Sequence, residues 1–96
     1  MIKIGIYPGT FDPLTTGHMD IITRSLKIVD SLIIAVANNV NKDSLLKINE
    51  RIDIINNDIN TLTGLQPKIK VIELSGLLTN FAESNNATCI IRGLRA

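Results

Sequence analysis

The sequence has few aromatic residues, a single cysteine and no long hydrophobic run. Aromatic side chains make up 3% of the 96 residues, so isoleucine, leucine and valine must fill the core. The one cysteine, Cys89, permits no internal disulfide, which favours a reducing, cytoplasmic location. We expect Cys89 to be buried, because it begins the apolar run Cys89-Ile90-Ile91. No signal peptide is recognisable and no run approaches the ~20 apolar residues of a transmembrane helix, so we expect no membrane partner.

A strong charge of one sign is also missing. Ten basic and nine acidic residues give a formal charge of +1, which offers no broad basic face, so we expect no nucleic-acid partner. One histidine and one cysteine do not show the spacing of metal ligands, so we expect no metal held by the protein itself. With 45% hydrophobic and 20% charged residues, the composition is typical of one folded domain over residues 1–96.

One polar stretch, residues 7–18, lies between two apolar segments. It contains two glycines, two prolines, three threonines and the only histidine, His18. The pattern predicts a strand at residues 3–7 before it and a helix from His18 to about Val29 after it. In a parallel α/β sheet such a joint lies at the carboxyl end of the strand, and the free N–H groups of the helix attract phosphate. The stretch therefore predicts a phosphate site unlike the G-x-G-x-x-G fingerprint or the P-loop.

Strands and helices alternate along the rest of the chain. Further strands are predicted at Leu32–Ala37, Ile69–Leu74 and Thr88–Ile91, and helices at residues 48–62 and 77–82. This alternation predicts an α/β fold with a parallel sheet. Because parallel strands end at one edge of the sheet, the polar residues that follow them should converge there. These residues are Thr10, Asn39, Lys42, Ser75, Arg92 and Arg95.

The segments that follow the first and fourth strands carry a family resemblance. Gly9-Thr10-Phe11-Asp12-Pro13 followed by Thr16-Gly17-His18 is similar to the signature of the T/H-x-G-H nucleotidyltransferase superfamily. The string Tyr7–Pro13, together with Ile91-Arg92-Gly93-Leu94-Arg95, resembles the bacterial phosphopantetheine adenylyltransferase family. The resemblance extends from Met1 to Ala96 and covers roughly the first three-fifths of such an enzyme. It therefore implies a Rossmann-like sheet that is incomplete at its C-terminus in this sequence.

The resemblance implies adenylyl transfer in coenzyme A synthesis. In such enzymes the phosphate of 4′-phosphopantetheine attacks the α-phosphorus of ATP, which yields dephospho-coenzyme A and pyrophosphate. The implied cofactor is Mg²⁺, bound mainly through ATP oxygens. The resemblance also implies a homo-hexamer.

Residue roles follow from the same resemblance, position by position. His18 corresponds to the group that stabilises charge on the ATP phosphates in the transition state. Thr10 corresponds to a hydrogen-bond donor to the transferring region, and Lys42 to the residue that orients the attacking phosphate. The implied ATP-binding residues are Thr10, Phe11, His18, Gly93, Leu94 and Arg95. The implied substrate-binding residues are Thr10, Lys42, Leu78 and Arg92.

Alternatives remain open for the function and for single residues. The chain is alternatively a nucleotidyltransferase for another phosphorylated substrate, such as nicotinate mononucleotide or glycerol phosphate, or an inactive phosphate-binding fragment. His18 can instead serve only as a helix cap, Thr10 as a turn hydroxyl and Lys42 as a solvated lysine. We interpret Asp12 as a loop-shaping residue rather than a general base. Glu50 and Arg51 are expected on the surface of the second helix.

Overall fold

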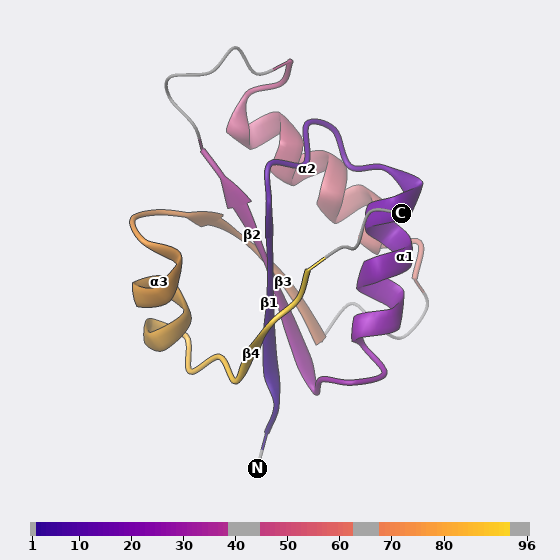
Figure 1. Ribbon diagram of the computed structural model, residues 1–96. Coiled ribbons are helices and arrows are strands. Elements are labelled where there is room, and N and C mark those ends of the chain that lie inside the picture. Colours follow the sequence, from indigo (N-terminus) through magenta and orange to yellow (C-terminus); the bar gives the residue numbers. More distant parts are fainter. Residues whose placement is uncertain (1, 39–44, 63–67, 93–96) are drawn as a thin grey trace.

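The architecture is a four-stranded parallel sheet with helices on both faces (Figure 1). The structure is a computed structural model that describes residues 2–38, 45–62 and 68–92. Along the chain, the elements are β1 (Ile4–Gly9), α1 (Thr16–Ser25), β2 (Ser31–Ala37), α2 (Ile48–Ile59), β3 (Ile69–Leu74), α3 (Leu78–Ser84) and β4 (Cys89–Ile90). The predicted α/β class, the Rossmann-like parallel sheet and the alternation of elements are confirmed.

The strand order is β3-β2-β1-β4, and every pair is parallel. Ile6 of β1 lies level with Ile33 of β2 on one side and with Ile90 of β4 on the other. All four strands therefore end at the same edge of the sheet, as the sequence pattern predicts. β1 lies between two partners, so the polar loop that follows it is placed near the middle of that edge.

The continuous apolar run of β2 is explained by cover on both faces of the sheet. Leu32, Ile34 and Val36 belong to a core cluster with residues of α1 and α2. Ile33 and Ala35 belong to a second cluster, on which α3 packs. Successive strand residues point to opposite faces, so both sets must be apolar.

Both long helices are shorter at their C-termini than the apolar spacing predicts. The predicted helix from His18 to about Val29 begins earlier, at Thr16, and ends at Ser25. Beyond Ser25, Lys27 N–H donates to Arg24 and Ile28 N–H to Ser25, which are i→i−3 bonds of a closing turn. α2 ends at Ile59 through the same kind of turn. After α1, Leu26 packs against the core and Val29 is 5% exposed, so the hydrophobic spacing continues past the end of the helix.

Two predicted burial states are wrong. Arg51 was expected on the helix surface, but it is 1% exposed because its guanidinium reaches the ends of β1 and β2. Glu50 is exposed, as expected. Cys89 was expected to be buried but is exposed. β4 pairs with β1 alone in the described sheet, and both of its residues are exposed, so the apolar run there does not indicate a covered strand.

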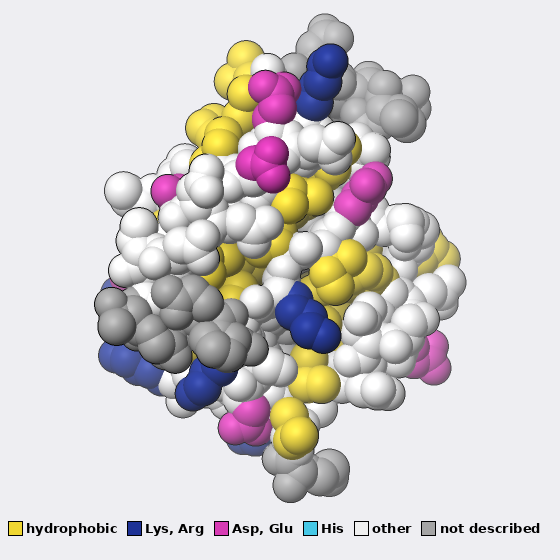
Figure 2. Space-filling view, turned by 180° about the vertical axis from the view of Figure 1, so that it is seen from behind, with side chains coloured by type: hydrophobic (Ala, Val, Ile, Leu, Met, Phe, Trp, Pro, Cys, Tyr) yellow, Lys and Arg dark blue, Asp and Glu magenta, His cyan; other side chains and the backbone are white. Residues whose placement is uncertain are grey.

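The view from behind shows a mixed face (Figure 2). Hydrophobic side chains lie in separate patches from the top of this face through its centre to its lower end, and basic and acidic side chains lie among and around them. The described residues visible there form no continuous basic surface, in keeping with the formal charge of +1.

The core placement predicts a large stability loss for Ile55→Ala. Ile55 is fully buried in α2, so the variant leaves a cavity and should lower the free energy of unfolding by about 2–5 kcal/mol. Urea unfolding followed by circular dichroism measures the change. The control is Ile28→Ala, the same chemical change in a side chain that is 63% exposed, with an expected effect within about 0.5 kcal/mol. Equal losses in the two variants would contradict the described core.

Candidate functional site

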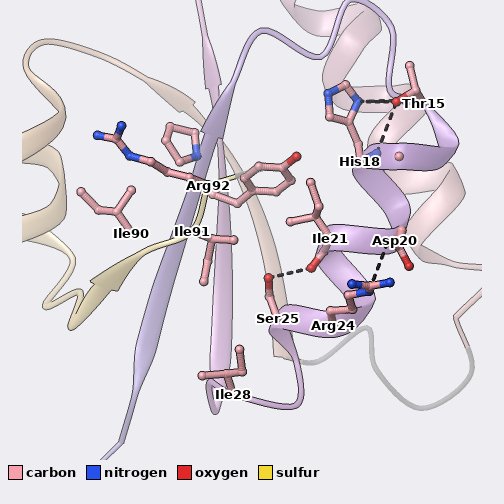
Figure 3. A pocket seen from close by; sticks show the side chains of 13 residues that line it. Thr15, His18, Asp20, Ile21, Arg24, Ser25, Ile28, Ile90, Ile91 and Arg92 are labelled. Carbon is pink, nitrogen blue, oxygen red and sulfur yellow. Dashed lines mark hydrogen bonds and ion pairs between the residues drawn. The ribbon is translucent and has the colours of Figure 1, made fainter. Parts of the chain in front are cut away.

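A pocket of about 830 Å³ lies beside α1, at the carboxyl ends of β1 and β4. β1 contributes Tyr7 and Pro8, and the end of β4 and the residues after it contribute the sequence Ile90 to Arg92. The remaining wall comes from the start and one side of α1, from Thr15 to Ile28. Figure 3 shows His18 and Ile21 on the α1 side and Arg92 on the opposite side. One end of the pocket therefore lies at the edge of the sheet where the sequence predicts a phosphate site.

Phe11 forms the inner support of this site. It has a φ of 50°, in the left-handed region that non-glycine residues rarely adopt, and its side chain is 2% exposed. Its ring meets the rings of Tyr7 and His18 edge-on, with centroid distances of 5.2 and 4.8 Å. A Cβ on Gly9 would lie 3.0 Å from that ring, so glycine at this position makes room for Phe11. The imidazole of His18 is thus packed against a buried ring.

The imidazole of His18 is oriented by the N-terminal cap of α1. The backbone N–H of Thr15 donates to Nδ1 of His18 over 2.9 Å, and the backbone N–H of His18 donates to the Thr15 hydroxyl over 3.3 Å. A backbone N–H can only donate, so Nδ1 must be the acceptor, and the neutral ring carries its proton on Nε2. His18 thus takes part in the helix cap, which is the alternative to its catalytic role, and the same bond leaves Nε2–H as a donor for a ligand.

The protonation state of His18 follows from its surroundings. Burial lowers the pKa of His18 below its usual 6.5, because the charged ring is less well solvated than the neutral one. The hydrogen bond from the Thr15 N–H also favours the neutral ring, because Nδ1 can accept it only while that nitrogen carries no proton. At neutral pH His18 is therefore an uncharged hydrogen-bond donor. The N-terminus of α1 carries a partial positive charge, and the first N–H groups of a helix have no acceptor within the helix. Both features attract phosphate.

Asp12 shapes the loop, as the sequence analysis proposes. Its carboxylate accepts the backbone N–H groups of Leu45 over 2.6 Å and of Leu46 over 2.8 Å. These bonds tie the loop after β1 to the segment that leads into α2. With both oxygens engaged, Asp12 is poorly placed to act as a general base.

The structure brings together only some of the predicted site residues. His18 and Arg92 line one pocket. Thr10 is exposed in the turn after β1 and Phe11 lies behind His18, but neither lines the pocket. Leu78 begins α3 and packs on the core of the opposite face, so its proposed contact with substrate stays a prediction. Lys42, Gly93, Leu94 and Arg95 lie outside the described residues.

One feature of the site was not predicted, and one nearby residue was predicted wrongly. Asp20 and Arg24 form an ion pair of 3.2 Å on the α1 wall of the pocket. Arg51 was assigned to the surface because of its charge, yet it is three residues after Ile48 and four before Ile55, on the buried stripe of α2. That spacing was the available signal. A charged residue on an apolar stripe indicates a buried polar contact when backbone acceptors lie within reach.

Within residues 2–38, 45–62 and 68–92, no three His, Cys, Asp or Glu side chains gather as a metal site would require. No helix in that part of the chain is long and apolar enough to cross a membrane.

Comparison with known proteins finds a matching family model and similar proteins. Residues 6–96 match the cytidylyltransferase-like family model. A phosphopantetheine adenylyltransferase of Wolbachia sp. subsp. Drosophila simulans is 54% identical over 94 residues, which are 98% of this chain and 54% of that protein. A phosphopantetheine adenylyltransferase of Parvibaculum lavamentivorans is 48% identical over 96 residues, covering 99% of this chain and 56% of that protein. The chain thus spans about half the length of the curated relatives it matches.

Solved structures share the fold at low sequence identity. The nicotinic acid mononucleotide adenylyltransferase of Plasmodium falciparum, complexed with NaAD, has a TM-score of 0.75 and 24% identity, over 93% of this chain and 50% of that one. A bifunctional NMN adenylyltransferase/ADP ribose pyrophosphatase from Francisella tularensis has a TM-score of 0.71 and 21% identity, over 94% of this chain and 32% of that one. At these identities the likeness supports the fold alone.

The lowered pKa of His18 makes a pH prediction. The folded protein favours the neutral ring, so its contribution to stability is complete above the unfolded value of about 6.5 and is lost as the pH falls through that value toward the folded pKa. Proton NMR of the only histidine should give a midpoint below 6.5 in the folded protein. The same titration in urea serves as the control and should return the usual value. A folded midpoint at or above the urea value would contradict the assigned environment.

Proposed function

The chain belongs to the cytidylyltransferase-like family, and from this we propose that it carries the catalytic centre of an enzyme that transfers adenylyl from ATP to 4′-phosphopantetheine. The observation that supports this most is the pocket with the capped N-terminus of α1, His18 and Arg92 on its walls. The relatives that match nearly the whole chain at about half identity are phosphopantetheine adenylyltransferases. Those relatives favour 4′-phosphopantetheine as the acceptor.

In the proposed reaction, a phosphate oxygen of the acceptor attacks the α-phosphorus of ATP, and the bond from that phosphorus to the pyrophosphate oxygen breaks. The chain supplies position and charge stabilisation rather than a covalent intermediate. The Nε2–H of His18 and the first N–H groups of α1 would hold the ATP phosphates as negative charge develops on them. Arg92, on the other side of the pocket, would bind the acceptor phosphate.

The remaining assignments come from the family resemblance. Thr10 would donate to the transferring phosphate, with the backbone of Phe11 against ATP. Lys42 would orient the acceptor phosphate, and Leu78 would contact the pantetheine arm. Gly93, Leu94 and Arg95 would line the ATP site. The proposed assembly is a cytoplasmic homo-hexamer.

A divalent metal fits this proposal as a companion of the nucleotide. The described residues offer no protein cage for an ion, which suits Mg²⁺ held mainly by ATP oxygens and water. Its contribution would be to neutralise charge on the triphosphate. A solved structure of a fold neighbour, from Francisella tularensis, is described as complexed with AMP and a manganese ion.

Turnover by a His18→Ala variant tests the proposed role of the imidazole. We expect kcat for pyrophosphate release to fall about 10²–10³-fold, because a donor to the transition state is lost, while KM for ATP changes by less than about threefold. Lys27→Ala is the control, since Lys27 is an exposed residue just beyond α1 that does not line the pocket. An equal loss in kcat and in ATP affinity would contradict a transition-state role.

The identity of the acceptor has a separate test. The protein is heated with ATP analogue and one acceptor at a time, and 4′-phosphopantetheine should raise the melting temperature more than nicotinate mononucleotide or glycerol phosphate at equal concentration. A larger shift with nicotinate mononucleotide would overturn the proposed substrate and leave the family assignment intact.

A further inference from the structure

The guanidinium of Arg51 connects three segments that are far apart in the sequence. It belongs to the first turn of α2 and is 1% exposed. Its Nη1 donates to the carbonyl oxygens of Thr10 and Ala37, over 2.9 Å in each case. Its Nε donates to the carbonyl of Leu46 over 3.2 Å. The loop after β1, the end of β2 and the segment before α2 are therefore held by one side chain.

Asp12, in the loop after β1, also binds the segment before α2. Leu46 donates its N–H to the Asp12 carboxylate and accepts a hydrogen bond from Arg51 on its carbonyl. The two charged side chains thus attach the loop that contains Thr10 to the start of α2 at several points. Within the described ranges, Arg51 forms no ion pair, and three backbone carbonyls accept its hydrogen bonds. Burying a guanidinium is costly, and its rigid fork here reaches carbonyls of three separate segments, which points to a requirement for geometry at this position.

We propose that Arg51 is a positioning residue for the transfer reaction. It does not line the pocket, but it fixes the carbonyl of Thr10 and so sets the backbone from which the Thr10 side chain projects. This inference rests on the proposed function, in which Thr10 donates to the transferring phosphate. Small misplacements of such a group reduce the rate of the chemical step far more than substrate affinity. Arg51 therefore acts through Thr10.

The direct test is Arg51→Lys. Lysine keeps the charge but has a single donor centre, so it cannot reproduce the fixed fork that reaches three carbonyls. We expect kcat to fall about 10–100-fold with KM for ATP within about threefold. In a Thr10→Ala background, the same substitution should lower kcat by less than about threefold, because the group it positions is already absent. An equal fold-change in both backgrounds would overturn the proposal, since a general structural role predicts that result.

A second measurement does not depend on turnover. Hydrogen exchange in Arg51→Lys should accelerate at the Leu45 and Leu46 amides, which donate to Asp12, while the Ile34 amide in the core is unchanged. Asp12→Asn, which leaves Arg51 in place, should accelerate the same two amides. Asp53→Asn is the control, because Asp53 is exposed on the same helix.

The two measurements separate the possible failures. Unchanged exchange at Leu45 and Leu46 in Arg51→Lys would overturn the positioning role, whatever the turnover. Accelerated exchange, together with a wild-type protein that releases no pyrophosphate from ATP in the presence of 4′-phosphopantetheine, would show that the proposed function has failed while the connection itself exists.

Discussion

The position of β1 between β2 and β4 is the constraint on which the rest of the structure depends. Parallel pairing on both sides brings the carboxyl ends of four strands to one edge and places the loop after β1 near the middle of it. That loop leads directly into the N-terminus of α1, so the helix begins at this edge, and Arg92 from the end of β4 lines the same pocket. A phosphate ligand, as proposed, would face the N-terminus of α1 at this edge and have room beside β4. The site is thus a consequence of strand order.

Within the site, one hydrogen bond decides what the histidine can do. Because Thr15 N–H occupies Nδ1 of His18, the ring presents Nε2–H outward, and burial favours its neutral form. The ring packs against Phe11, whose unusual backbone conformation is accommodated by the missing side chain of Gly9. The capping bond and the aromatic contact fix the direction of the donor before any ligand binds. Such preorganisation is what phosphoryl and nucleotidyl transfer require of a protein.

Much of this arrangement could be predicted from the sequence because hydrophobic periodicity reports burial. The strand at Ile69–Leu74, the start of α2 at Ile48 and the convergence of the loops all follow from it. Arg51 escaped prediction because its charge suggested solvent, whereas its acceptors are backbone carbonyls that become neighbours only in the fold. Cys89 was misjudged for the opposite reason. An apolar run indicates burial only if something covers it, and the described chain leaves β4 exposed.

The central claim is that the edge formed by the N-terminus of α1 and the end of β4 binds the phosphates of a nucleotide. Titration of the ¹⁵N-labelled protein with a non-hydrolysable ATP analogue and Mg²⁺, followed by two-dimensional NMR, tests it most directly. The largest amide shifts should fall on Thr16, Gly17 and His18, with a smaller set at Arg92. Shifts concentrated on α3, across the sheet, or no shift at millimolar analogue in the folded protein would contradict the account.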